Sequence, residues 1–179
     1  MRSLILDRDG VINKDSRDFI RSPADFRPLP GSLEAIARAQ SGGFRIIVVS
    51  NQSGISRGLF DIAALNAIHR RLLDDLARYG ASIDAFFFCP HGSGDNCSCR
   101  KPKTGLLRAI RDRLGIDLTK TAFVGDKISD LTAAVSVGAK PLLVRTGLDV
   151  IDVETLKAIG DIEVFDDLMG AVSAVIAQS

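Results

Sequence analysis

The stretch LILDRDGVIN, residues 4–13, begins with three apolar residues and then places carboxylates at Asp7 and Asp9. Alternation along an extended chain points both acidic side chains roughly the same way, and Gly10 allows a sharp turn behind them. Two carboxylates so close together repel each other unless a cation lies beside them. The stretch therefore predicts a buried strand that ends at a cation site, although an ordinary turn at a strand end explains the same residues.

Short apolar runs recur along the chain and alternate with amphipathic segments. The runs predict buried strands at 3–6, 45–50, 84–89, 121–125, 140–145 and 161–165. The amphipathic segments predict helices at 32–43, 61–80, 104–115, 129–138 and 167–178. This alternation indicates an α/β fold, a three-layer Rossmann-like sandwich whose central parallel sheet is covered on both faces. We expect a single domain over residues 1–179, with a loop insertion from Val11 to Gly31.

Charge and the first residues of the chain narrow the class of protein. The 23 basic and 22 acidic residues leave a net charge of +1, so no broad electrostatic surface for nucleic acid or anionic membrane is expected. The apolar run near the N-terminus is too short for a signal peptide or a membrane span. We therefore expect a cytoplasmic, monomeric protein that acts on a small molecule, with neither nucleic acid nor membrane as a partner.

Polar residues follow four of the predicted strands, at the edge where such sheets bind ligands. They are Asp7 and Asp9 after the first strand, Ser50, Asn51 and Gln52 after the second, Arg100 and Lys101 after the third, and Gly125 and Asp126 after the fourth. Taken singly, each group fits a plain turn or a helix cap. Together, Asp7, Asp9 and Asp126 form an oxygen-rich set that suits Mg²⁺.

The segment CPHGSGDNCSCRKP, residues 89–102, contains every cysteine of the chain. Cys89, His91, Cys97 and Cys99 form the spacing Cys-x-His-x5-Cys-x-Cys. Four nitrogen and sulfur ligands suit tetrahedral Zn²⁺ and leave no open position for water, so we expect a structural zinc loop over 89–99. The alternative is a set of unrelated loop cysteines beside a free histidine.

The motifs taken together resemble a known group of enzymes. DxDG, a hydroxyl residue, a lysine and GDxxxD after successive strands resemble the haloacid dehalogenase superfamily of phosphohydrolases, over residues 4 to about 146. The stretches DRDGVIN, VVSNQSGISRG, CPHGSGDNCSCRKP, VGDK and LVRTG resemble its D-glycero-D-manno-heptose 1,7-bisphosphate 7-phosphatases, with the histidinol-phosphate phosphatases next. The loop GSGDN is shorter than in several heptose phosphatases, which predicts a differently shaped substrate pocket.

The resemblance implies a role for each residue of the site. Asp7 would be the nucleophile, Asp9 the general acid and base, and Arg100 would orient the substrate. Ser50 and Lys101 would stabilise the transferring phosphoryl group, and Mg²⁺ would be held by Asp7, Asp126 and the backbone carbonyl of Asp9. Physical chemistry supports these roles, because a carboxylate can attack a phosphate dianion only when cations neutralise the phosphoryl oxygens.

No span of the sequence is long enough for a separate cap domain, so specificity should come from short loops at 13–30 and 51–60 and from the zinc loop. The candidate substrate residues by position are Asn13, Asp15, Asn51, Gln52, Ser53 and Arg57, and Lys127 resembles a substrate-contacting lysine of the heptose family. For Lys127 the alternative is a surface lysine. Asp130 is expected to support the site without binding metal, and His69 is expected at a helix surface or partly buried.

These expectations converge on an Mg²⁺-dependent phosphatase that removes the 7-phosphate of heptose 1,7-bisphosphate through an aspartyl-phosphate. It would supply nucleotide-activated heptose for lipopolysaccharide core. Histidinol-phosphate phosphatase is the alternative enzyme, and a non-catalytic zinc-stabilised binding module is the alternative from another class.

Overall fold

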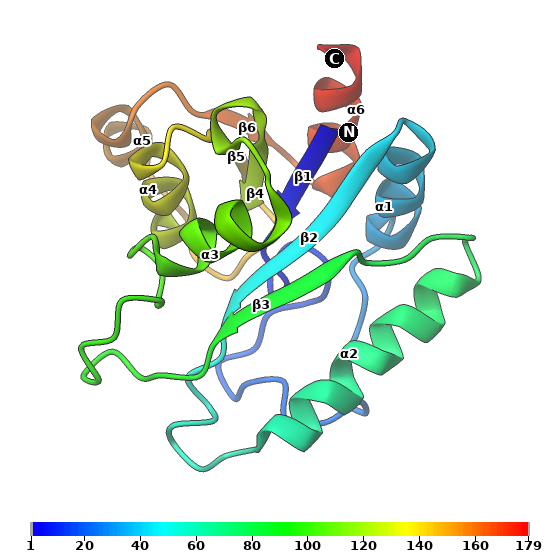
Figure 1. Ribbon diagram of the computed structural model, residues 1–179, viewed down its shortest axis with the longest axis vertical. Coiled ribbons are helices and arrows are strands. Elements are labelled where there is room, and N and C mark those ends of the chain that lie inside the picture. Colours follow the sequence, from blue (N-terminus) through cyan, green and yellow to red (C-terminus); the bar gives the residue numbers. More distant parts are fainter. Residues whose placement is uncertain (1, 179) are drawn as a thin grey trace.

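The computed structural model describes residues 2–178, which form a six-stranded parallel sheet with helices on both faces (Figure 1). The strands are β1 (Arg2–Leu6), β2 (Phe44–Asn51), β3 (Ala85–Cys89), β4 (Ala122–Gly125), β5 (Lys140–Val144) and β6 (Glu163–Phe165). They are hydrogen-bonded in the order β3-β2-β1-β4-β5-β6. All six predicted strands are confirmed, and so is the predicted α/β fold.

Helices bury both faces of this sheet. The helices α1 (Ser32–Ser41), α2 (Ile62–Ala77) and α6 (Leu168–Ala177) pack on one face, and α3 (Gly105–Leu114) and α4 (Ile128–Ser136) pack on the other (Figure 1). Leu4 and Leu6 of β1 face the first core, whereas Ile5 faces the second. Because both faces are buried, the strand reads in the sequence as an unbroken apolar run.

The predicted loop insertion is also present. Between β1 and α1 the chain forms neither a helix nor a strand, and isolated bridges from Asn13 to Asp9 and Pro28 fix its path. Ser32 donates from its hydroxyl to the carbonyl of Ile12 at 2.7 Å, which ties the start of α1 to this loop. The insertion therefore lies beside the carboxyl end of β1.

One α-helix and a short 3-10 helix at Leu118–Lys120 were not predicted. The segment α5 (Val153–Ile159) begins at Asp152, whose side chain accepts from the backbone N–H of Thr155. It has only seven residues, about two turns, which is too short for its apolar residues to show a helical period in the sequence. Within residues 2–178 no helix combines the length and the apolar character that crossing a membrane requires.

Candidate active site

Three carboxylates gather where the strand order reverses, between the carboxyl ends of β1 and β4. Asp7 follows β1, and its backbone N–H donates to the carbonyl of Val124 in β4 at 2.9 Å. Asp126 follows β4, and Asp130 lies in the first turn of α4. Carboxylate oxygens of Asp7, Asp126 and Asp130 lie within 4.8 Å of one another, and all three residues are buried. The structure thus brings Asp7 and Asp126 together as expected, and Asp130 lies with them.

Asp126 has the surroundings of a metal ligand. It is 1% exposed, and neither carboxylate oxygen accepts a hydrogen bond, although Nζ of Lys127 lies 3.3 Å from Oδ2. Burial and the nearby charge of Asp7 raise the pKa of Asp126 to about 8. A methyl group added at Gly10 or Gly147 would overlap its carboxylate. Unsatisfied buried oxygens with space kept around them fit a divalent cation that prefers oxygen ligands.

Lys101 supplies positive charge next to the candidate nucleophile. Its Nζ lies 2.9 Å from Oδ1 of Asp7 and 2.6 Å from Oδ1 of Asp130, and it donates to the carbonyl of Val49 at 2.9 Å. Burial alone would lower the pKa of Lys101, but Asp130 and Asp7 outweigh burial and raise it. A charge held so firmly can receive a phosphoryl oxygen without reorganisation.

Asp9 is held by a ring of donors. Arg8 donates from Nε to Oδ1 at 3.0 Å and from Nη2 to Oδ2 at 2.9 Å. The side-chain amides of Asn13 and Gln52 donate to the same carboxylate at 2.9 Å and 3.0 Å. Burial would raise the pKa of Asp9, but these donors, Arg8 foremost, lower it. Arg8 is fully buried, and sequence reasoning missed it although it follows β1 at an inward-facing position.

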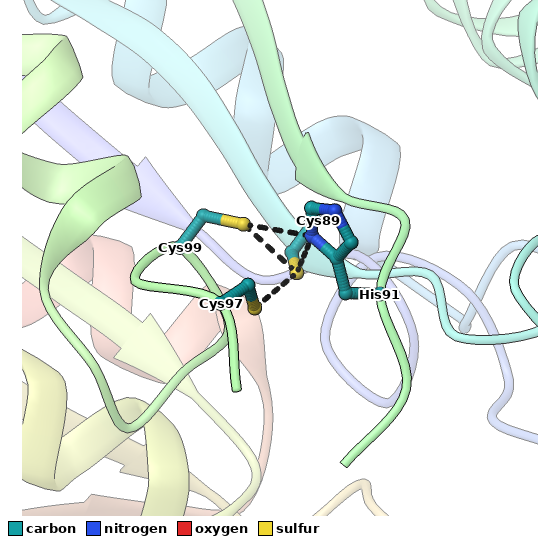
Figure 2. Close-up of side chains that lie close together, drawn as sticks. All are labelled: Cys89, His91, Cys97 and Cys99. Carbon is teal, nitrogen blue, oxygen red and sulfur yellow. Dashed lines mark hydrogen bonds between the residues drawn. The ribbon is translucent and has the colours of Figure 1, made fainter. Parts of the chain in front are cut away.

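The predicted zinc ligands converge at the carboxyl end of β3 (Figure 2). Sγ of Cys89 lies 3.1 Å from Sγ of Cys99, 3.7 Å from Sγ of Cys97 and 3.5 Å from Nδ1 of His91. Zinc–sulfur bonds of about 2.3 Å in a tetrahedron separate the ligand atoms by about 3.7 Å. All three cysteines are free of disulfides, so their thiols are available to a metal. The donor set and its spacing fit zinc, and the zinc itself stays a prediction.

The zinc loop is joined to the candidate active site through Arg100. Its Nη1 donates to the carbonyl of His91 at 3.2 Å. The next residue, Lys101, is the lysine beside Asp7. A single short segment therefore connects the four converging ligands with the cations of the site.

Two family models match this sequence, and together they span residues 1–171. The model described as haloacid dehalogenase-like hydrolase matches residues 1–134, and a second, described as HAD-hydrolase-like, matches residues 98–171. The chain belongs to the haloacid dehalogenase-like hydrolases. The resemblance inferred from the motifs is thereby confirmed.

Relatives of this haloacid dehalogenase-like hydrolase cover nearly its whole length. It is 47% identical to a D-glycero-beta-D-manno-heptose-1,7-bisphosphate 7-phosphatase of Pseudomonas aeruginosa, over 97% of each chain. It is 50% identical to the enzyme of the same name from Bordetella bronchiseptica, over 82% of each chain. The crystal structure of the B. bronchiseptica D,D-heptose 1,7-bisphosphate phosphatase complexed with magnesium and phosphate is similar with a TM-score of 0.91 and 43% identity, and the match covers 100% of both chains.

A pocket of 260 Å³ opens over Asp7, Asp9 and Asp130 in this haloacid dehalogenase-like hydrolase, and Asp126 does not line it. Its lining includes most of the predicted site residues: Asp7, Asp9, Asp15, Asn51, Gln52, Arg100, Lys101 and Lys127. It also includes Asp130, which was expected to support the site, and Ser16, Phe19, Ile20 and Ser129, which were not foreseen. Asn13, Ser50 and Ser53 are buried and do not line the pocket, and Arg57 is exposed.

Several predicted substrate residues have protein partners in this structure. Lys127 lies 2.8 Å from Oδ2 of Asp15, and Asn51 bonds to the main chain of Lys101. The hydroxyl of Ser50 is buried without a hydrogen-bond partner among the described residues, and Ser50 does not line the pocket. The substrate contacts themselves stay predictions.

Proposed function

We propose that this chain is an Mg²⁺-dependent phosphatase that removes the 7-phosphate of D-glycero-β-D-manno-heptose 1,7-bisphosphate. The observation that carries the proposal is the buried Asp7 beside Lys101, within a carboxylate cluster that fits a divalent cation. The names of the relatives support the substrate and its β anomer, and the magnesium and phosphate of the B. bronchiseptica enzyme support the ion. None of these relatives is named a histidinol-phosphate phosphatase, so the comparisons do not favour that alternative substrate.

In the proposed reaction Asp7 is the nucleophile. Its Oδ1 accepts from Nζ of Lys101 and from the backbone N–H of Arg8, which leaves the other oxygen to attack phosphorus. The new bond from Asp7 to phosphorus forms as the bond from phosphorus to the sugar oxygen breaks. Mg²⁺, when bound to Asp7, Asp126 and the carbonyl of Asp9, would neutralise charge on the phosphoryl group. Lys101 and the free hydroxyl of Ser50 would hold its remaining oxygens.

Asp9 is proposed to handle both protons. In the first step its carboxylic acid would give a proton to the departing sugar oxygen, and in the second it would take one from the water that hydrolyses the aspartyl-phosphate. The donors from Arg8, Asn13 and Gln52 keep the pKa of Asp9 low, which suits the second step. Asn13 and Gln52 are therefore proposed to position Asp9, and Gln52 also lines the pocket.

Zn²⁺ bound by Cys89, His91, Cys97 and Cys99 is proposed to be structural. Four protein ligands would leave no position at which the metal could activate water. By fixing the carbonyl of His91, the metal would also fix the guanidinium of Arg100, which we propose orients the substrate.

Short loops are proposed to take the place of a separate cap domain in this single domain. Residues from 13–30 and 51–60 line the pocket, and the loop 89–99 precedes Arg100 in its wall. The proposed substrate contacts are Asn13, Asp15, Asn51, Gln52, Ser53 and Arg57 of the first two loops, with Lys127 before α4. We also propose that the protein acts in the cytoplasm as a monomer, without nucleic acid or membrane partners. Its product would supply nucleotide-activated heptose for lipopolysaccharide core.

A substrate comparison tests this function. We expect phosphate release from heptose 1,7-bisphosphate with a kcat/KM well above that for histidinol phosphate, with the β anomer preferred and with activity lost when Mg²⁺ is chelated. Asp7→Asn should abolish turnover while the protein remains folded, whereas Asp112→Asn, at an exposed acid of α3, should not change it. A higher kcat/KM for histidinol phosphate would contradict the substrate, and no phosphate release from either would support a binding module.

A further inference from the structure

The walls of the candidate active-site pocket are polar except at one place. Among the described residues that line it, Phe19 and Ile20 alone are apolar. Ile20 is 5% exposed and belongs to the hydrophobic core, so it offers little surface to a ligand. The partly exposed ring of Phe19 is therefore the apolar surface of this pocket.

The backbone holds Phe19 in a conformation that its side chain disfavours. Its φ is 66°, in the left-handed region, where a bulky residue is a genuine outlier. Such strain persists only where the surroundings enforce it, and it is concentrated at functional sites. Among residues 2–178, Asn96 is the one other non-glycine residue with a positive φ.

Fixed points on both sides of Phe19 enforce this conformation. Its backbone N–H donates to the carbonyl of Ser16 at 3.1 Å, which closes a turn before it. After it, Ile20 is anchored in the core, and the backbone N–H groups of Arg21 and Ser22 donate to Oδ2 of Asp25 at 3.1 Å and 2.9 Å. The loop therefore holds the ring at the pocket.

The ring is also held from a second loop. The guanidinium of Arg57 lies over it, 5.5 Å from its centroid, at a distance that gives a favourable cation–π contact. Phe19 belongs to the loop 13–30 and Arg57 to the loop 51–60, so this contact joins the two loops that were expected to set specificity. Together they make an ordered aromatic wall at the mouth of a charged site.

We propose that Phe19 recognises the carbon skeleton of the substrate by packing its ring against the C–H face of the sugar. The inference rests on the proposed function, because it requires a cyclic sugar phosphate as substrate. The face of an aromatic ring is negative and attracts weakly positive C–H groups, which a pyranose presents on one side. Among the described residues that line the pocket, Phe19 alone presents an apolar face to the substrate, and packing against that face would distinguish a sugar ring from an acyclic phosphate.

The experiment compares Phe19→Leu, Phe19→Tyr and wild type with two ligands. Heptose 1,7-bisphosphate has the ring and the phosphates, whereas inorganic phosphate, a product inhibitor, has no carbon skeleton. We expect Phe19→Leu to raise KM for the bisphosphate about three- to tenfold, with kcat changed less than about twofold and the Ki of inorganic phosphate unchanged. Phe19→Tyr, which keeps the ring, should retain the wild-type KM.

Thermal unfolding of each variant establishes that the loop change leaves the fold intact. If Phe19→Leu does not fold, Phe19→Gly replaces it, because glycine adopts a positive φ without strain. An unchanged KM in the ring-less variant overturns the inference, and so does a parallel rise in KM and Ki, which would indicate a distorted site. A wild-type protein that releases no phosphate from the bisphosphate contradicts the proposed function and this inference with it, whereas an active wild type confines any failure to Phe19.

Discussion

The side chain of Asn51 forms hydrogen bonds with both polar main-chain atoms of Lys101. Its Nδ2 donates to the carbonyl of Lys101 at 3.0 Å, and its Oδ1 accepts from the backbone N–H of Lys101 at 3.0 Å. Asn51 ends β2 and Lys101 lies beyond β3, so this pair joins two loops at the sheet edge. The lysine next to the candidate nucleophile is thus positioned by an amide that the sequence suggested for the substrate.

Removing these two hydrogen bonds should lower kcat, although no charged group is removed. We expect Asn51→Ala to lower kcat about 10- to 100-fold, because a misplaced Lys101 no longer meets the phosphoryl oxygen. The matched control is Asn66→Ala, on the exposed side of α2. Steady-state kinetics at saturating Mg²⁺ give kcat for both variants. A wild-type kcat in Asn51→Ala would show that the hydrogen bonds from Asn51 are not needed to position Lys101.

The space around Asp126 should matter for the metal. A side chain at Gly147 would overlap the carboxylate of Asp126, so Gly147→Ala should raise the Mg²⁺ concentration for half-maximal activity about 10- to 100-fold. Direct titration of Mg²⁺ by calorimetry should show the same loss of affinity. Gly94→Ala is the control, since a methyl group there meets no atom within 4 Å. Equal Mg²⁺ affinity in both variants would refute a role for Asp126 as ligand.

Loss of the predicted zinc should impair the active site, because it would displace Arg100. We expect Cys99→Ser to lower the zinc content, the melting temperature and kcat/KM together, because the carbonyl of His91 would no longer hold the guanidinium in place. Ser93→Ala, in the same loop, is the control. Elemental analysis, thermal unfolding and kinetics are the measurements, and normal kinetics in a zinc-free Cys99→Ser protein would show that the two sites are independent.

His69 should make the fold less stable in acid. It is 7% exposed, more buried than its helical position suggested, and it stacks on Phe86 at 4.1 Å between ring centroids. Burial, followed by the charge of Arg8, lowers its pKa from 6.5 to about 4. Because the unfolded chain binds the proton more tightly, the free energy of unfolding should fall as pH drops from about 6.5 to 4.

The size of this effect can be measured against a variant that keeps the stack. We expect wild type to lose about 2 kcal/mol of stability between pH 7 and pH 5 that His69→Phe does not lose. Urea unfolding of both proteins at the two pH values gives the difference. Identical pH dependence in the two proteins would mean that His69 is not the titrating group.

Much of this structure follows from local sequence. The strands were predictable because both of their faces are buried, and Asp7 and Asp126 because each directly follows such a strand. The cysteine cluster was predictable from spacing alone. By contrast, the partners of Asp9 depend on how the insertion after β1 folds back, and no local pattern shows that Arg8 is buried.

Phe19 and α5 are two further features that the local sequence does not predict. A phenylalanine in a polar loop gives no sign that its backbone is left-handed, since tertiary contacts enforce that conformation. The helix α5 has seven residues, none of them fully buried, so its sequence is too short to show the pattern that packing imposes on longer helices. Sequence reasoning succeeded where burial shaped the residues and failed where loop geometry did.

The two ligand clusters at adjacent strand ends differ in chemical hardness. One consists of carboxylates alone, and the other of three thiols and an imidazole. Hard oxygen donors suit Mg²⁺ and soft sulfur donors suit Zn²⁺, so the two clusters would differ in the divalent cation that they prefer. Each ion would select its own cluster by the electronic character of the donors, although the two clusters are part of the same sheet edge.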